Sequence, residues 1–245
     1  MISIGPSLTG SAARRRAASG ILTPTVVLNI GDDGNATWGN DSNEFPPPDG
    51  GYCTKTVTGV GGPFLSSLAI LAGATEPPTY NTGQGIHTLG ANAALTCATP
   101  VVIPADADCV IYLKCVVSDT MYQLGSTSNQ ACIQFDAAAG FYMQGNDASV
   151  VSLYGEPAAG TYLVRVRRAS NAWRIAWTGQ ADAAAEGDAI GGASLSFDTL
   201  LARSGATPGL AFFSSTGQYL QKAYIYHGSS TPDTDYETAN GGVLS

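Results

Sequence analysis

The stretch TYLVRVRRASNAWRIAWT, residues 161–178, constrains the fold of this chain more than any other segment. Apolar and aromatic residues occupy every second position on both sides of a short polar break. They are Tyr162, Val164, Val166, Trp173, Ile175 and Trp177. A period of two is typical of a β-strand that buries one face. The stretch therefore predicts two antiparallel strands joined by a tight turn.

The predicted pairing of these strands places Val166 opposite Trp173 and Tyr162 opposite Trp177. In this register one face of the hairpin is wholly apolar or aromatic, so we expect that face to lie in a core. The two tryptophans are then core side chains rather than platforms on which a sugar stacks.

The other face of the predicted hairpin carries the arginines Arg165, Arg167, Arg168 and Arg174, with Arg165 facing Arg174. Like charges that oppose each other on a sheet repel unless an anion or an acidic neighbour compensates. One interpretation is that the arginines bind an acidic glycan, a phosphate or an acidic patch on a partner subunit. The other, which is favoured because exposed ion pairs are common, is that they pair with acidic residues of the same chain.

The bulk composition favours short strands and argues against two classes of partner. A chain of 245 residues can form one large all-β domain or two smaller ones. Only 12% of residues are charged, and there are 30 Gly and 13 Pro, which suits strands joined by turns. The net charge of −8 argues against non-specific binding to DNA or an anionic membrane. No run approaches the roughly 18 apolar residues of a membrane span, so we expect neither a membrane nor a specific nucleic-acid partner.

The chain is predicted to divide into three regions. Residues 1–20 lack a sustained period and are expected to form a flexible or docking arm. The arm carries Arg14, Arg15 and Arg16, which either touch packaged nucleic acid or an acidic docking surface, or belong to a disordered tail. Residues 21–79 are expected to form a small β-rich attachment segment, in which residues 64–74 have apolar spacing that suits helix or strand. Residues 80–245 are predicted to form a β-sandwich.

Candidate strands follow one another in this last region at the spacing of a sandwich or barrel. Besides the hairpin they are residues 94–97, 109–117, 121–126, 131–136, 140–144, 150–154, 194–200, 209–214 and 220–227. The end of the chain predicts a short helical turn, with Thr231 before Pro232 as its start. The five cysteines form no C-x-x-C pair and are predicted to be free, buried thiols.

The order of these features resembles the concanavalin A-like, laminin G-like jelly-roll sandwiches. The resemblance rests on CVIYLKCVV, MYQLGSTSNQACIQFDAAAGFYMQG, TYLVRVRRASNAWRIAWTG and LQKAYIYHGSSTPDTDYET, taken in that order. It implies an all-β, concanavalin A-like jelly-roll β-sandwich preceded by the arm and the small β-rich segment. The opening MISIGPSLTG, followed by the triple arginine, resembles the N-termini of virion proteins of tailed bacteriophages.

No catalytic constellation stands out. Glycoside hydrolases of this fold class carry an E-x-D-x-E strand, whose alternate carboxylates share one face. None of the five glutamates here belongs to such a triplet. The two histidines, His87 and His227, lie far apart in sequence, and no nucleophile motif accompanies them. We therefore expect a protein that is not an enzyme.

No cofactor is predicted, and calcium is the one ion for which the loops offer ligands. Asp32, Asp33 and Asp41 crowd one turn-rich stretch, and Asp106 and Asp108 occupy alternate positions before a strand. Neither set matches a twelve-residue calcium loop. Asp is also a residue that turns prefer for backbone reasons, so solvated turns are the favoured interpretation.

These observations predict a non-enzymatic structural protein of a tailed-phage-like virion, such as a spike, fibre or decoration protein, assembled in the host cytoplasm. Its expected partners are other virion subunits and copies of itself, as a trimer or higher homo-oligomer, with a contact to host surface glycan. The alternative is a carbohydrate-binding module. A third hypothesis is a polysaccharide hydrolase or lyase with an unrecognised site.

Overall fold

The structure is a computed structural model of the chain. It describes residues 26–29, 38–39, 50, 55–56, 68–70, 78–81, 83–87, 94–136, 140–146, 157–184, 190–204, 210–212 and 219–244. Several predictions lie outside these residues: the arm with Arg14, Arg15 and Arg16, the calcium candidates Asp32, Asp33 and Asp41, and the candidate strand at 150–154.

One sheet of the structure has eight antiparallel strands. They are β1 (Val26–Asn29), β5 (Thr79–Asn81), β6 (Gly85–His87), β8 (Cys109–Val117), β12 (Gly160–Ala169), β13 (Ala172–Trp177), β14 (Gln180–Ala184) and β18 (Tyr219–His227). Their spatial order is β14-β13-β12-β8-β18-β6-β5, and β1 also pairs with β18.

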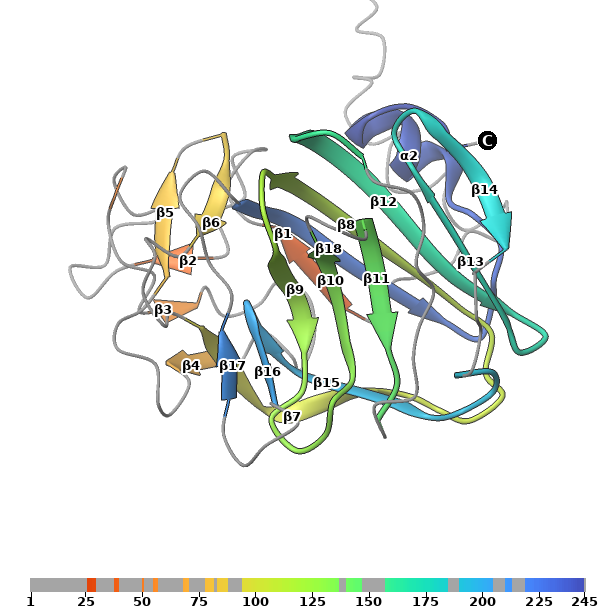
Figure 1. Cartoon of the computed structure of the whole chain (residues 1–245), viewed down its shortest axis with the longest axis horizontal. Coiled ribbons are helices and arrows are strands. Elements are labelled where there is room, and N and C mark those ends of the chain that lie inside the picture. Colours follow the sequence, from red (N-terminus) through yellow and green to blue (C-terminus); the bar gives the residue numbers. More distant parts are fainter. Residues whose placement is uncertain are drawn as a thin grey trace, which may run out of the picture.

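The second sheet has six antiparallel strands. They are β4 (Leu68–Ile70), β7 (Leu95–Ile103), β9 (Met121–Gly125), β10 (Cys132–Asp136), β11 (Gly140–Gln144) and β15 (Leu195–Leu200), in the spatial order β11-β10-β9-β15-β7-β4. There are also two small antiparallel pairs of strands. In one, β2 (Trp38–Gly39) pairs with β3 (Lys55–Thr56), and in the other, β16 (Ala202–Ser204) pairs with β17 (Leu210–Phe212). The two large sheets stack on each other (Figure 1), which confirms the predicted all-β jelly-roll sandwich.

The core lies between the two large sheets, because alternate residues of each sheet point inward. Ile111 of β8 and Trp177 of β13 come from one sheet, and Phe135 and Phe141 from the other. The predicted apolar face of the hairpin is confirmed as core. Its members Val164, Val166, Trp173, Ile175 and Trp177 are buried, and Tyr162 packs against them.

The predicted register of that hairpin is wrong by two residues. Val166 pairs with Ile175 rather than with Trp173, and Arg167, not Arg165, faces Arg174. The reason is the turn: Ser170 and Asn171 have φ of +49° and +65°, which makes a two-residue turn of the I′ kind. Such a turn matches the twist of the strands, and a shift of two residues does not change which face of the sheet a side chain occupies.

Several strands extend or add to the prediction. β8 and β11 have the predicted bounds, whereas β7 continues through Pro100 to Ile103, and β14 was not predicted. Within the ambiguous stretch 64–74, residues Leu68–Ile70 form a strand. The division of the chain at residue 79 stays a prediction, and β1 and β4, which precede it, are hydrogen-bonded into the two large sheets.

The helix α2 (Thr234–Asn240) covers the outer face of the eight-stranded sheet (Figure 1). Its N-cap is Asp233, whose carboxylate accepts a hydrogen bond from the Tyr236 N–H at 2.9 Å, rather than the predicted Thr231. A second apolar cluster lies beneath the helix. Its buried members are Val110, Tyr112, Leu163, Ala176, Tyr226, Tyr236 and Leu244.

Three cysteine side chains are buried and free, as predicted, and those of Cys53 and Cys97 lie outside the described ones. The three belong to Cys109, Cys115 and Cys132. Burial raises the pKa of the Cys109 thiol to about 11 and that of Cys115 to about 12. Both thiols are therefore protonated and unreactive at neutral pH.

Candidate functional site

Three of the predicted site arginines converge on one carboxylate on the outer face of the eight-stranded sheet. Asp182 of β14 lies 2.5 Å from Arg167 Nη2, 2.6 Å from Arg174 Nε and 3.3 Å from Arg165 Nη2. Burial opposes ionisation of Asp182, but the hydrogen bonds from Arg167 and Arg174 outweigh it and lower its pKa to about 2. The carboxylate is thus ionised at any physiological pH.

Arg165 continues this cluster inward to the C-terminal helix. Its Nη1 donates to Glu237 Oε1 at 2.5 Å and to the carbonyl of Leu244 at 2.8 Å. Glu237 is wholly buried and also accepts from Tyr112 Oη at 2.9 Å and from the Leu244 N–H at 2.8 Å. The cluster therefore fixes α2 and the following residues to the sheet.

The arginines Arg165, Arg167 and Arg174 are thus joined to acidic residues of the same chain, as in the second sequence-based interpretation. A contact of these residues with a ligand or a partner subunit stays a prediction.

Arg168 does not belong with the other three, and its predicted place on their face is wrong. Alternation along β12 puts it on the core side with Val164 and Val166, and its side chain is wholly buried. Its Nε donates to the carbonyl of Ala107 at 2.7 Å, and its Nη1 and Nη2 donate to two further carbonyls at 2.6 Å. Those carbonyls belong to Ala193 and Pro104. The guanidinium also lies over the ring of Trp173, at 5.2 Å from the centroid.

Arg168 thereby joins loops at one end of the sandwich. We call this the loop end; it comprises residues 104–108, 170–171, 190–194 and 228–230. These loops meet because β8 begins at Cys109, opposite Arg168 of β12 and His227 of β18. The loop end lies at the lower right in Figure 1.

Further hydrogen bonds join the loops of the loop end to one another. The Asp108 carboxylate accepts from the Ser170 N–H at 2.9 Å and from Ser230 Oγ at 3.0 Å. Trp173 Nε1 donates to the carbonyl of Gly191 at 2.9 Å. Every loop of the end is therefore bonded to at least one other.

The loop end carries an exposed polar group formed by Asp106, Asn171 and Gly192, which we call the Asp106–Asn171 group. Asn171 Nδ2 donates to Asp106 Oδ1 at 2.8 Å, and the Asp106 N–H donates to the carbonyl of Gly192 at 2.8 Å. A Cβ on Gly192 would lie 2.8 Å from Asn171 Nδ2 and closer still to Asp106 Oδ1. A side chain at 192 would therefore displace this pair from its position.

Both side chains of the pair keep hydrogen-bonding capacity for a ligand. Asp106 and Asn171 are exposed, with φ of +58° and +65°. Within the described part of the chain, Asp106 Oδ2 and Asn171 Oδ1 have no protein partner. These two oxygens can accept hydrogen bonds from neighbouring hydroxyl groups of one molecule, and the second N–H of Asn171 Nδ2 can donate one.

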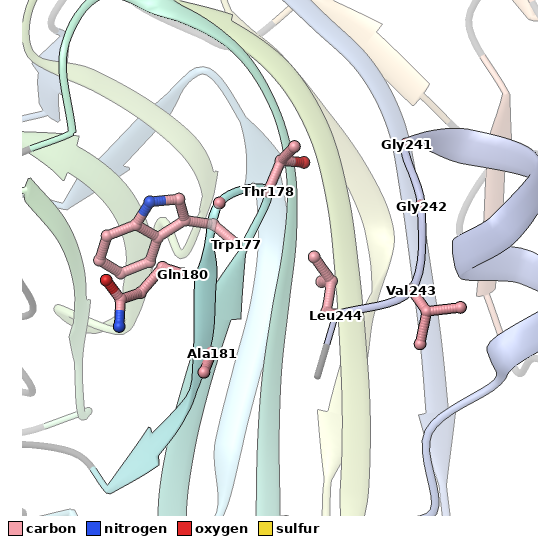
Figure 2. A pocket seen from close by; sticks show the side chains of 9 residues that line it. Trp177, Thr178, Gln180, Ala181, Gly241, Gly242, Val243 and Leu244 are labelled. Carbon is pink, nitrogen blue, oxygen red and sulfur yellow. The ribbon is translucent and has the colours of Figure 1, made fainter.

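A second candidate is a hollow of about 460 Å³ between residues 177–181 and 241–244. Figure 2 shows the side chains of Trp177 and Gln180 on one side of β14, and Val243 and Leu244 on the other. Three of its lining residues are glycines, and Thr178 Oγ1 already accepts from the Leu163 N–H at 3.1 Å. The hollow thus offers mostly main chain, so the Asp106–Asn171 group is the better candidate.

The structure separates the other residues that the sequence singled out. Asp106 and Asp108 bind different partners, and no group of three His, Cys, Asp or Glu side chains in the described ranges could hold a metal ion. His87 is buried on β6 against Tyr219, with ring centroids 4.6 Å apart, and His227 ends β18. Among the described helices, none has the length and apolar character needed to cross a bilayer.

Sequence reasoning did not single out Asp182, Asn171 or Gly192. Asn171 had a local signal, because a Ser-Asn pair between two alternating stretches is typical of a turn. The contact between Asp106 and Asn171, which are 65 residues apart, had no signal in the local sequence.

Comparison with known proteins finds no family model and no curated protein that match the sequence. Among solved structures, the chain is similar to peanut lectin with a 9mer peptide, with TM-score 0.41 and 9% identity over 71% of this chain and 94% of the lectin. It is also similar to carbohydrate-binding module CBM66 from Bacillus subtilis, with TM-score 0.34 and 11% identity over 66% and 92% of the two chains. For an alginate lyase of polysaccharide lyase family 7, the TM-score is 0.39 and the identity 9%, over 62% and 83%. At these TM-scores, function has to be inferred from the chain's own residues.

Proposed function

We propose that this chain is a non-catalytic carbohydrate-binding β-sandwich whose site is the Asp106–Asn171 group. The observation that carries the proposal is the exposed carboxylate–amide pair, held at 2.8 Å on loops that the buried Arg168 fixes. Sugars present adjacent hydroxyl groups, which such a pair can bind together. Because the loops are already ordered, little conformational entropy is lost on binding.

The expected affinity for a single sugar is low. Three or four hydrogen bonds at an exposed site, each contributing about 1 kcal/mol, correspond to a Kd of about 1 mM. Multivalent presentation raises the apparent affinity without new contacts. A glycan array or an immobilised polysaccharide is therefore the suitable assay.

The test compares two exposed aspartates. Asp106→Ala should abolish binding of the wild-type glycans, whereas Asp119→Ala should retain it, because Asp119 follows β8 at the opposite end of the sandwich. Gly192→Ala should also abolish binding, since the new Cβ displaces the Asp106 carboxylate. Binding that survives both changes at the loop end would place the site elsewhere.

The virion role stays a further proposal, and it is compatible with glycan binding. Its support is the resemblance of the N-terminal arm to virion proteins of tailed bacteriophages. It assigns the protein to a particle assembled in the host cytoplasm, as a trimer or higher oligomer beside other subunits. Mass spectrometry of purified particles tests the location, and light scattering tests the oligomeric state; a strict monomer absent from particles would reject this role.

A further inference from the structure

We infer that the Asp106–Asn171 group selects uncharged sugars and rejects uronic, sialic and sulfated ones. The inference rests on the proposed function and names the class of glycan that the site accepts. It follows from the signs of the charges at the loop end and from how each charge is already bonded.

Exposed negative charge dominates the loop end. The Asp106 carboxylate is exposed and uses one of its oxygens for Asn171. Asp108 lies in the same loop and accepts from Ser170 and Ser230. An acidic sugar placed on Asn171 would bring its anion next to the Asp106 carboxylate.

None of the residues that form the loop end is basic, and the neighbouring Arg168 offers no exposed guanidinium to a ligand. Arg168 is wholly buried, and its Nε, Nη1 and Nη2 each donate to a main-chain carbonyl. A guanidinium in this state has no exposed fork for a carboxylate or sulfate. His227 is half-buried at the end of β18, opposite Cys109, and is not one of the residues that form the loop end. The residues described at 190–194 are Ile, Gly, Gly, Ala and Ser and carry no charge.

The other three arginines of the hairpin have their side chains on the outer face of the eight-stranded sheet. Arg167 and Arg174 are on the outer face, where both bind Asp182. An acidic glycan and a neutral glycan would therefore use two different surfaces of this chain. This separation makes the inference testable by mutation.

The experiment is affinity electrophoresis of the full chain in gels that contain mannan, galactan or a β-glucan, compared with alginate, polygalacturonate or polysialic acid. EDTA is present throughout, so that a divalent cation cannot bridge two anions. The wild type should bind a neutral polysaccharide at least about tenfold more tightly than any acidic one. Raising the salt concentration from about 20 to about 300 mM should reduce this difference in affinity, because salt screens the repulsion between the acidic polysaccharide and Asp106. Asp106→Asn should narrow it too, by removing the repelling charge.

The outcomes separate the inference from the proposed function. Preferential binding of an acidic polysaccharide that Asp106→Ala abolishes would overturn the inference and leave the proposed site standing. Acidic binding that Arg174→Glu abolishes and Asp106→Ala does not would overturn both and assign the ligand to the outer arginines. Failure to bind any polysaccharide in the array or the gels would overturn the proposed function, and the inference with it.

Discussion

Replacing Arg168 with methionine should loosen the loop end and destabilise the whole sandwich. Methionine fills much of the same volume but leaves three carbonyls without their buried donor. A carbonyl that loses its partner costs about 1–3 kcal/mol, and the lower figure applies here because Pro104 and Ala193 are exposed residues that water can reach. Removing the buried charge also removes its desolvation cost, which keeps the total loss at about 3 kcal/mol.

Urea unfolding of the two proteins measures this loss as a shift of the midpoint at constant slope. Hydrogen exchange locates it: the Asp106 amide, bonded to Gly192, should exchange faster in Arg168→Met, while amides in the middle of β8 change little. The matched control is Arg174→Met, because that side chain is 37% exposed and should cost less than about 1 kcal/mol. If Arg168→Met costs no more than the control, the buried arginine does not hold the loops.

Three further changes test other parts of the structure. Neither side-chain polar atom of the buried Gln123 has a hydrogen-bond partner within the described residues. Gln123→Met should therefore raise the free energy of unfolding, measured by urea titration, by about 1–2 kcal/mol. A lower free energy of unfolding would show that the amide is hydrogen-bonded. Glu237→Gln leaves the buried Arg165 with Asp182, at 3.3 Å, as its remaining counter-charge. It should therefore cost less than the roughly 3–5 kcal/mol of a fully broken buried pair, with early loss of α2 in hydrogen exchange; an unchanged midpoint would show that Glu237 does not hold α2 to the sheet. The pKa of Asp182 is about 2 in the fold against an ordinary 3.8, so its stabilisation is complete above about pH 4 and is lost as the pH falls towards about 2. Asp182→Asn should therefore lower the Tm at pH 7 and flatten its fall below about pH 4, and parallel curves would contradict the ion-pair geometry.

The sequence by itself determined the fold class and the core side of the central hairpin. The alternation around Val164 and Ile175 has a period of two, and that period is a local property that any strand must satisfy to bury one face. The same local information predicted the bounds of β8 and β11 and the presence of a terminal helix. It also favoured acidic partners within the chain for the arginines, because exposed ion pairs are common.

Only the tertiary structure decided which residues meet. Arg167 reaches Asp182 across 15 residues, Arg165 reaches Glu237 across 72, and Asn171 reaches Asp106 across 65. These contacts depend on strand order and on the end at which each loop emerges, and neither leaves a periodic trace in the sequence. The turn at 170–171 sets a hairpin register that differs by two residues from the predicted one. The cross-strand partners therefore differ from the prediction, while the alternation of faces along each strand is unchanged. The contacts of Arg168 could not be predicted from the sequence either. Alternation along the strand puts Arg168 on the core side, but the three carbonyls that accept from its buried guanidinium come from loops that only the assembled sandwich brings together.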